Sequence, residues 1–194
     1  MKDIETLGNY KMSLVEVVFG KKSDELGELT LASPNGKKII LRGKIDRVDT
    51  YKKDDKVYVN IIDYKSSARD LRKSDVLNGV ELQIITYMYV LMNKAENLLG
   101  GEIIPNSMLF YHVNEPKVKA EDAAEAEKER QSALKPKGLF VAEEHTASID
   151  GNRGLESLIT ETENINEYFP LLEKKDGTFN SHSKKRVMSP EMFK

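Results

Sequence analysis

Hydrophobic and polar positions alternate over much of residues 11–66. Segments rich in β-branched and aromatic residues occupy residues 11–19, 27–33, 37–51 and 56–66, and turn sequences such as SPNGK and KKDDK separate them. Short polar turns between alternating segments are typical of strands that follow one another in a sheet. The pattern predicts a meander of about four β-strands.

The pattern becomes helical at residues 80–99, which are too long for a strand and apolar on almost every side. This predicts a helix buried on most faces, preceded by a polar loop at 68–79. The remaining predictions are a strand at 107–113, a charged surface helix at 119–135, two short strands within 138–150, helical segments within 153–169 and a helix start at 187–194. The order of elements predicts an α/β fold with a mixed central β-sheet flanked by helices.

Composition narrows the possible functions. The chain has 194 residues, a net charge of −2 and no cysteine, so we expect one domain without disulfides or thiolate metal sites. The near-neutral charge is not that of a self-sufficient DNA-binding protein, so any nucleic-acid affinity is local or supplied by a partner. No segment approaches the ~18 apolar residues of a membrane span, and the N-terminus lacks a signal-peptide pattern. We expect a cytoplasmic protein with no membrane partner.

Charged residues stand at the end of the strand predicted at 56–66. Residues two apart in a strand share a face, so Asp63 and Lys65 continue the apolar row that includes Ile61. Charges on a buried row are unfavourable unless they are paired, hydrated or bound to a metal. Considered alone, the sequence Asp63–Tyr64–Lys65 is better explained by a surface ion pair at the strand end, and the other motifs favour a functional role.

A second carboxylate, Asp46, lies on the preceding strand. If the hairpin is symmetric about Lys53 and Asp54, Asp46 opposes Ile61 and lies diagonal to Asp63 on the same face. This prediction requires an even number of loop residues. Two carboxylates so placed can share a divalent ion that prefers oxygen ligands, Mg²⁺ or Mn²⁺. Lys65 would then orient a water molecule or stabilise charge on a phosphate.

The predicted helix carries Gln83 and Tyr87 four residues apart, so both lie on one side of it. A buried glutamine needs hydrogen-bond partners. Either the two residues belong to the core, or they reach toward the strand ends that carry the carboxylates.

Three motifs together resemble the RecB-like branch of the PD-(D/E)XK nucleases. GKIDRVD matches its G-x-x-D-R strand, IIDYKSS its D-Y-K strand end and LQIITYMYV its Q-x-x-x-Y helix. The later segments LFYHVNEP and LKPKGLFVAEE resemble those of the nuclease domains of helicase/deoxyribonuclease B subunits of the AddB/RexB type. The resemblance covers residues 12–193, and the order and spacing of the motifs make it specific.

The resemblance implies a restriction-endonuclease-like core and a role for each motif residue. The expected metal ligands are Asp46 and Asp63, the catalytic lysine is Lys65, and the helix pair is Gln83 and Tyr87. Glu16, in LVEVVFG, matches a strand glutamate that often precedes this core, and it is either a further metal ligand or a plain exposed residue.

This chain departs from many relatives, in which four cysteines hold an iron–sulfur cluster. Without cysteine, it cannot hold that cluster. A helix that usually precedes the strands is barely present before Tyr10. We therefore expect residues 1–194 to be a single nuclease domain belonging to a longer subunit.

The resulting hypothesis is a metal-dependent DNA exonuclease domain of a helicase–nuclease complex that acts in double-strand break processing and recombinational repair. Its partners would be DNA, mainly single-stranded ends, and a helicase subunit, because this chain lacks the phosphate loop of a motor. One alternative is a non-catalytic module for DNA binding or subunit contact. Another is a stand-alone exonuclease of the RecB family. The combination of Asp46, Asp63 and Lys65 favours catalysis.

Overall fold

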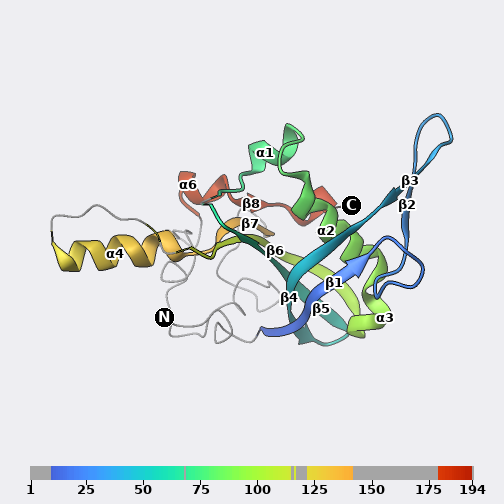
Figure 1. Ribbon diagram of the computed structural model, residues 1–194, viewed down its shortest axis with the longest axis horizontal. Helices are drawn as coiled ribbons and strands as arrows, with labels where there is room; N and C mark the ends of the chain where they lie inside the picture. The colour runs from blue at the N-terminus through green and yellow to red at the C-terminus, as the bar shows by residue number, and fades with distance from the viewer. Residues whose placement is uncertain (1–9, 68, 115, 117–121, 142–178, 194) are drawn as a thin grey trace.

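A central six-stranded mixed sheet organises the protein in the computed structural model, which describes residues 10–67, 69–114, 116, 122–141 and 179–193 (Figure 1). The strand order is β1-β4-β5-β6-β7-β8. The strands are β1 (Lys11–Phe19), β4 (Gly43–Lys53), β5 (Lys56–Lys65), β6 (Glu102–His112), β7 (Lys137–Val141) and β8 (Val187–Met188). The pairs β5–β6 and β7–β8 are parallel and the others antiparallel, which confirms the predicted α/β fold with a mixed sheet.

The predicted meander is wrong in its connections. Residues 37–51 form two strands, β3 (Lys38–Leu41) and the first part of β4, with exposed Arg42 between them. Strand β2 (Leu29–Ala32) pairs only with β3, as a separate two-stranded ribbon that projects from the sheet (Figure 1). Because this ribbon leaves the sheet, β4 pairs directly with β1.

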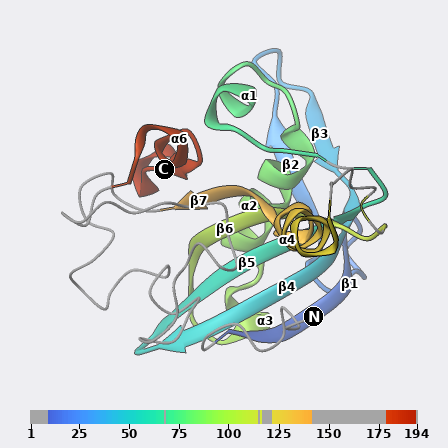
Figure 2. The same ribbon diagram turned by 90° about the vertical axis from the view of Figure 1, so that its left-hand side faces the viewer.

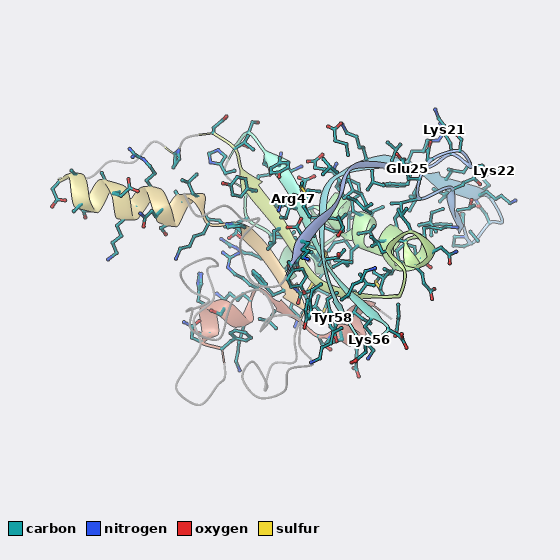
Figure 3. All side chains as sticks on the ribbon, turned by 90° about the horizontal axis from the view of Figure 1, so that it is seen from below. Lys21, Lys22, Glu25, Arg47, Lys56 and Tyr58 are labelled. Atoms are coloured by element: carbon teal, nitrogen blue, oxygen red, sulfur yellow. The ribbon has the colours of Figure 1, made fainter. Side chains whose placement is uncertain are left out.

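The hairpin between β4 and β5 has an even loop, as predicted, but a different register. Lys53 opposes Lys56 across a two-residue turn, and Asp54 adopts φ 54°, a left-handed conformation that aspartate tolerates better than most residues. Ile61 therefore opposes Val48, and the prediction that it opposes Asp46 is wrong. Figure 3 shows Lys56 and Tyr58 at this hairpin end, away from Lys21, Lys22 and Glu25 between β1 and β2.

The long helix predicted at 80–99 is divided at Ala95 into α2 (Leu82–Lys94) and α3 (Glu96–Leu99). One side of α2 packs on the sheet, with Ile84, Met88 and Leu91 fully buried. Leu82 and Tyr89 are exposed, so the expectation of burial on most sides is wrong. The segment predicted as a loop contains a short helix, α1 (Lys73–Leu77).

The remaining elements mostly follow the pattern of the sequence. Strand β6 begins earlier than predicted, and α4 (Ala123–Leu134) buries no residue and projects from the body (Figures 1 and 2). Near the C-terminus, α6 (Ser181–Lys184) precedes β8, and a short 3₁₀ helix (Pro190–Phe193) follows, so the helix start predicted within 187–194 is a 3₁₀ helix that begins after the strand. The predictions for 142–150 and for 153–169 lie outside the described residues. No described helix is long and apolar enough to cross a membrane.

A partly buried ion pair ties the C-terminal part to the loop after β5. Both terminal nitrogens of Arg186 donate to the Asp70 carboxylate, and the Nη2–Oδ2 distance is 2.8 Å. The backbone nitrogen of Lys73 also donates to the carbonyl of Lys185, at 3.1 Å. Burial alone would raise the pKa of Asp70, but the hydrogen bonds and charge of Arg186 outweigh it and lower this pKa. The ionised pair therefore stabilises the fold.

We expect Asp70→Asn to lower the free energy of unfolding by about 1–3 kcal/mol at pH 7, because it leaves a buried guanidinium without its counter-charge. A lowered folded-state pKa contributes stability above the ordinary carboxyl value of ~3.9, and this contribution is lost as the pH falls through the folded value. Urea unfolding from pH 7 downward should show the difference between parent and variant shrinking in acid. Glu127→Gln, in an exposed pair with Arg130, is the control and should change stability by less than about 0.5 kcal/mol. Equal stability of Asp70→Asn and the parent at pH 7 would contradict this account.

Candidate active site

Strands β4 and β5 separate where the motif aspartates lie. Their register ends at the pair Arg47 and Ile62, although both strands continue beyond it. Ile45 and Val48 belong to the same core cluster, whereas uninterrupted alternation would place them on opposite faces. The regular strand pattern is thus broken around Asp46.

Asp46 bridges the gap between the separating strands. Its Oδ2 atom accepts a hydrogen bond of 3.0 Å from the backbone nitrogen of Tyr64, the residue after Asp63. One carboxylate oxygen is thereby fixed against β5. Asp46 reaches the same strand end as Asp63 through this contact, which the predicted hairpin pairing did not anticipate.

Asp63 is the most buried charged residue of the site, with 3% of its surface exposed. Its Oδ2 atom lies 2.5 Å from Lys65 Nζ but makes no hydrogen bond of good geometry among the described residues. Burial raises the pKa of Asp63, and the negative charge of Asp46 adds to this shift, while Lys65 and Arg69 oppose it. A cation near both carboxylates would therefore be stabilised.

Lys65 connects the strand end to helix α2. Its ammonium donates a hydrogen bond of 3.3 Å to Gln83 Oε1, and Gln83 Nε2 donates one of 2.7 Å to the hydroxyl of Tyr87. The ammonium also lies 5.4 Å from the centroid of the Phe110 ring. Gln83 is exposed, so the prediction that it is buried is wrong. The pair nevertheless faces the D-Y-K strand end.

Tyr87 is held in place by packing that explains the glycine of the G-x-x-D-R motif. A Cβ atom on Gly43 would lie 2.7 Å from the Phe19 ring and 3.2 Å from the Tyr87 ring. The Phe19 and Tyr87 rings meet edge to face, with centroids 5.9 Å apart. Burial raises the pKa of Tyr87, as do the nearby charges of Asp63 and Asp46, although its bond with Gln83 opposes the shift. Tyr87 is therefore held by Phe19 and Gln83, within the electrostatic influence of both carboxylates.

Glu16 does not join this cluster. Its side chain is 68% exposed on the edge strand β1, and its Oε1 atom lies 2.8 Å from Lys44 Nζ. The hydrogen bond from Lys44 and the charge of Glu16 raise the pKa of Lys44, and Asp46 contributes to the same shift. Glu16 thus contacts Lys44, two residues before Asp46. It stays a less favoured candidate for metal binding than Asp46 and Asp63.

The donor atoms fit a hard divalent cation. Asp46 and Asp63 could provide oxygen ligands, and the buried Oδ2 atom of Asp63 lacks a well-formed hydrogen bond among the described residues. No cluster of three or more His, Cys, Asp or Glu side chains suited to a metal ion occurs in the described part of the chain. An ion held by these two carboxylates would need further ligands such as water, as is common for Mg²⁺.

Sequence reasoning missed two contributors to this site. The backbone nitrogen of Tyr64 fixes Asp46, and the Phe110 ring lies beneath the Lys65 ammonium. Phe110 pairs with Asp63 in the parallel β5–β6 register. The sequence shows no signal for either contact, because each depends on how two strands are aligned.

Comparison with known proteins assigns the family. The PD-(D/E)XK nuclease superfamily matches residues 5–172, and the chain belongs to this superfamily. Similar proteins include the B subunit of the ATP-dependent helicase/deoxyribonuclease of Lysinibacillus sphaericus, 35% identical over 94% of this chain and 15% of the relative. The proteins of the same name from Oceanobacillus iheyensis and Natranaerobius thermophilus are 33% and 34% identical over 88% and 92% of this chain. The chain spans about one seventh of the length of these relatives.

We expect Asp63→Asn to keep or slightly raise the melting temperature in EDTA, because it removes a buried charge that Asp46 repels. In the parent, Mg²⁺ or Mn²⁺ at a concentration 100 times Kd should stabilise the folded state by about 2.7 kcal/mol, and the melting temperature should rise accordingly. The variant should lose this increase. Thermal unfolding with each metal and with EDTA measures both effects, and Glu16→Gln tests whether Glu16 contributes. An equal metal-induced increase in parent and Asp63→Asn would exclude Asp63 as a ligand.

Proposed function

We propose that the protein is a metal-dependent DNA exonuclease domain whose active site consists of Asp46, Asp63 and Lys65. The observation that supports this most directly is the meeting of a buried carboxylate, a second carboxylate and an ammonium where β4 and β5 separate. Such a group suits phosphodiester hydrolysis, which needs a cation and a charge-stabilising donor. Members of this superfamily generally depend on divalent metal ions, and Mg²⁺ or Mn²⁺ is the ion we propose here.

Each residue has a distinct proposed role. Asp46 and Asp63 would hold the ion, which supplies Lewis acidity and lowers the pKa of a bound water molecule. Lys65 would stabilise the negative charge that develops on the phosphate, since its ammonium lies 2.5 Å from Asp63 Oδ2. Gln83 would orient Lys65 through the 3.3 Å hydrogen bond, and Tyr87 would orient Gln83.

The names of the relatives support a wider context. They are described as ATP-dependent helicase/deoxyribonuclease B subunits, so we propose that this chain is a single nuclease domain that works beside a helicase subunit. Single-stranded DNA ends delivered by that motor would be the substrate, in double-strand break processing and recombinational repair. The net charge of −2 supports this proposal, because delivery by a motor reduces the need for high intrinsic affinity. A cytoplasmic location follows from the same proposal.

Asp63→Asn and Lys65→Ala should separate metal binding from catalysis. Both should abolish or strongly reduce cleavage of end-labelled DNA, with Lys65→Ala costing about 10²- to 10³-fold, as expected for the loss of one transition-state donor. Only Lys65→Ala should keep the metal-induced rise in melting temperature. Digestion of single- and double-stranded DNA with Mg²⁺, Mn²⁺ or EDTA, with and without the helicase subunit, provides the measurement.

Cleavage by both variants at the rate of the parent would refute the nuclease assignment. A non-catalytic DNA-binding or subunit-contact module would then be the better account. Cleavage by the isolated parent that the helicase subunit does not change would instead favour a stand-alone exonuclease.

Gln83→Leu should lower the cleavage rate without weakening metal binding. It keeps much of the side-chain volume but removes the acceptor for Lys65, a hydrogen bond to a charged group worth about 1.5 kcal/mol, or roughly tenfold in rate. Single-turnover cleavage and metal-dependent melting should be measured together. Asn93→Leu, farther along α2, is the matched control and should cleave like the parent. A rate unchanged in Gln83→Leu would leave Gln83 and Tyr87 as packing residues.

A further inference from the structure

A positively charged hollow adjoins the candidate active site. It is lined by residues from the end of β5, the loop after it, the end of β6 and the connection from α4 to β7, among them Lys65, Arg69, His112, Lys135 and Lys137. The hollow is partly open to solvent, and the described residues that line it include no carboxylate. The hollow therefore concentrates positive charge in a protein whose net charge is −2.

Sheet register places this hollow beside the proposed reacting centre. Asp63 pairs with Phe110 on β6, and Phe110 pairs with Lys137 on β7. Lys137 therefore stands two strands from Asp63 in the same row, roughly 10 Å away at the usual strand spacing. Lys65 contributes both to the ion pair with Asp63 and to the lining of the hollow. A DNA strand bound at the carboxylates of Asp46 and Asp63 would thus reach the hollow.

Side chains that line the hollow are partly held by other contacts or by burial. They suit an anion that also binds outside the hollow. Arg69 also lies 2.9 Å from Glu81, and its side chain is about half exposed. The Nε2 atom of His112 contacts the backbone oxygen of Ser66 at 3.1 Å, which orients the ring. Lys135 and Lys137 are partly buried, so their side chains are more restricted than those of exposed lysines.

We propose that this hollow binds a phosphate of the DNA strand adjacent to the phosphate being cleaved, with Lys135 and Lys137 as its principal contacts. The inference rests on the proposed function, since the same strand occupies both sites. Phosphate fits better than a carboxylate ligand, because cations converge from several sides on an open hollow continuous with a site for phosphodiester chemistry. The interaction positions the strand and is independent of base sequence.

The test compares Lys135→Gln/Lys137→Gln with the parent in binding to a fluorescent single-stranded oligonucleotide in Ca²⁺ over a range of salt concentrations. The double variant should bind more weakly, and the slope of log K against log salt should fall by about 0.7 for each phosphate that the variant no longer neutralises. The effect should be the same for different base sequences. Lys56→Gln, at the hairpin end of the sheet (Figure 3), is the matched control and should bind like the parent.

Two further measurements identify the cause of any loss of binding. Melting temperatures establish that the double variant is folded, and oligonucleotides with and without a terminal phosphate distinguish an internal phosphodiester from a phosphorylated end. A difference seen only with terminal phosphate would overturn the assignment to an internal phosphate and place the strand end in the hollow. Equal affinity and equal salt slope in parent and double variant would overturn the inference, even if the parent cleaves DNA. A parent that binds through these lysines but does not cleave would overturn only the nuclease assignment.

Discussion

The buried carboxylate of Asp63 is the constraint on which the site depends. An ionised group with 3% of its surface exposed is unfavourable in a protein interior unless positive charge lies close to it. Lys65, two residues later on the same strand, supplies that charge at 2.5 Å. Lys65 is in turn held by Gln83 on α2, so the position of the helix is coupled to the charge balance at the end of β5. Strand β5 and helix α2 are therefore linked through Asp63, Lys65 and Gln83.

The separation of β4 and β5 follows from the residues that the two strands carry at this end. Continued pairing beyond Arg47 and Ile62 would use the Tyr64 nitrogen for a backbone ladder bond, whereas Asp46 now accepts from it. A side chain thus replaces a backbone acceptor at the point where the sheet opens. Gly43, where no side chain fits against the Phe19 and Tyr87 rings, lets α2 approach the beginning of β4 closely. The spacing of the G-x-x-D-R motif reflects both requirements.

Local patterns were sufficient to predict the fold class and most of the central strands and helices. They were insufficient where tertiary pairing decides the outcome. The ribbon of β2 and β3 leaves the sheet although both segments have ordinary strand patterns, because pairing partners are not encoded locally. The hairpin register differs from the symmetric prediction because the two-residue turn lies at Asp54 and Asp55, with Asp54 at a positive φ, so the hairpin is centred one residue later than predicted. For the site, the assumed hairpin pairing and the family resemblance predicted Asp46 and Asp63 as neighbours, but the hydrogen bond from the Tyr64 nitrogen to Asp46 required knowledge of strand separation.

The charge distribution shows why a protein of near-neutral charge can suit a polyanionic substrate. The cations of the hollow come from residues 65–69 and 135–137, two segments that lie far apart in the sequence and contain no long basic run. Only the adjacency of β5, β6 and β7 brings them together. Two of these cations also pair with acids, Lys65 with Asp63 and Arg69 with Glu81, as Lys44 does with Glu16 outside the hollow. Under our proposal, local convergence of cations rather than net charge would determine where a phosphate chain binds, and the sheet order places the hollow near Asp63.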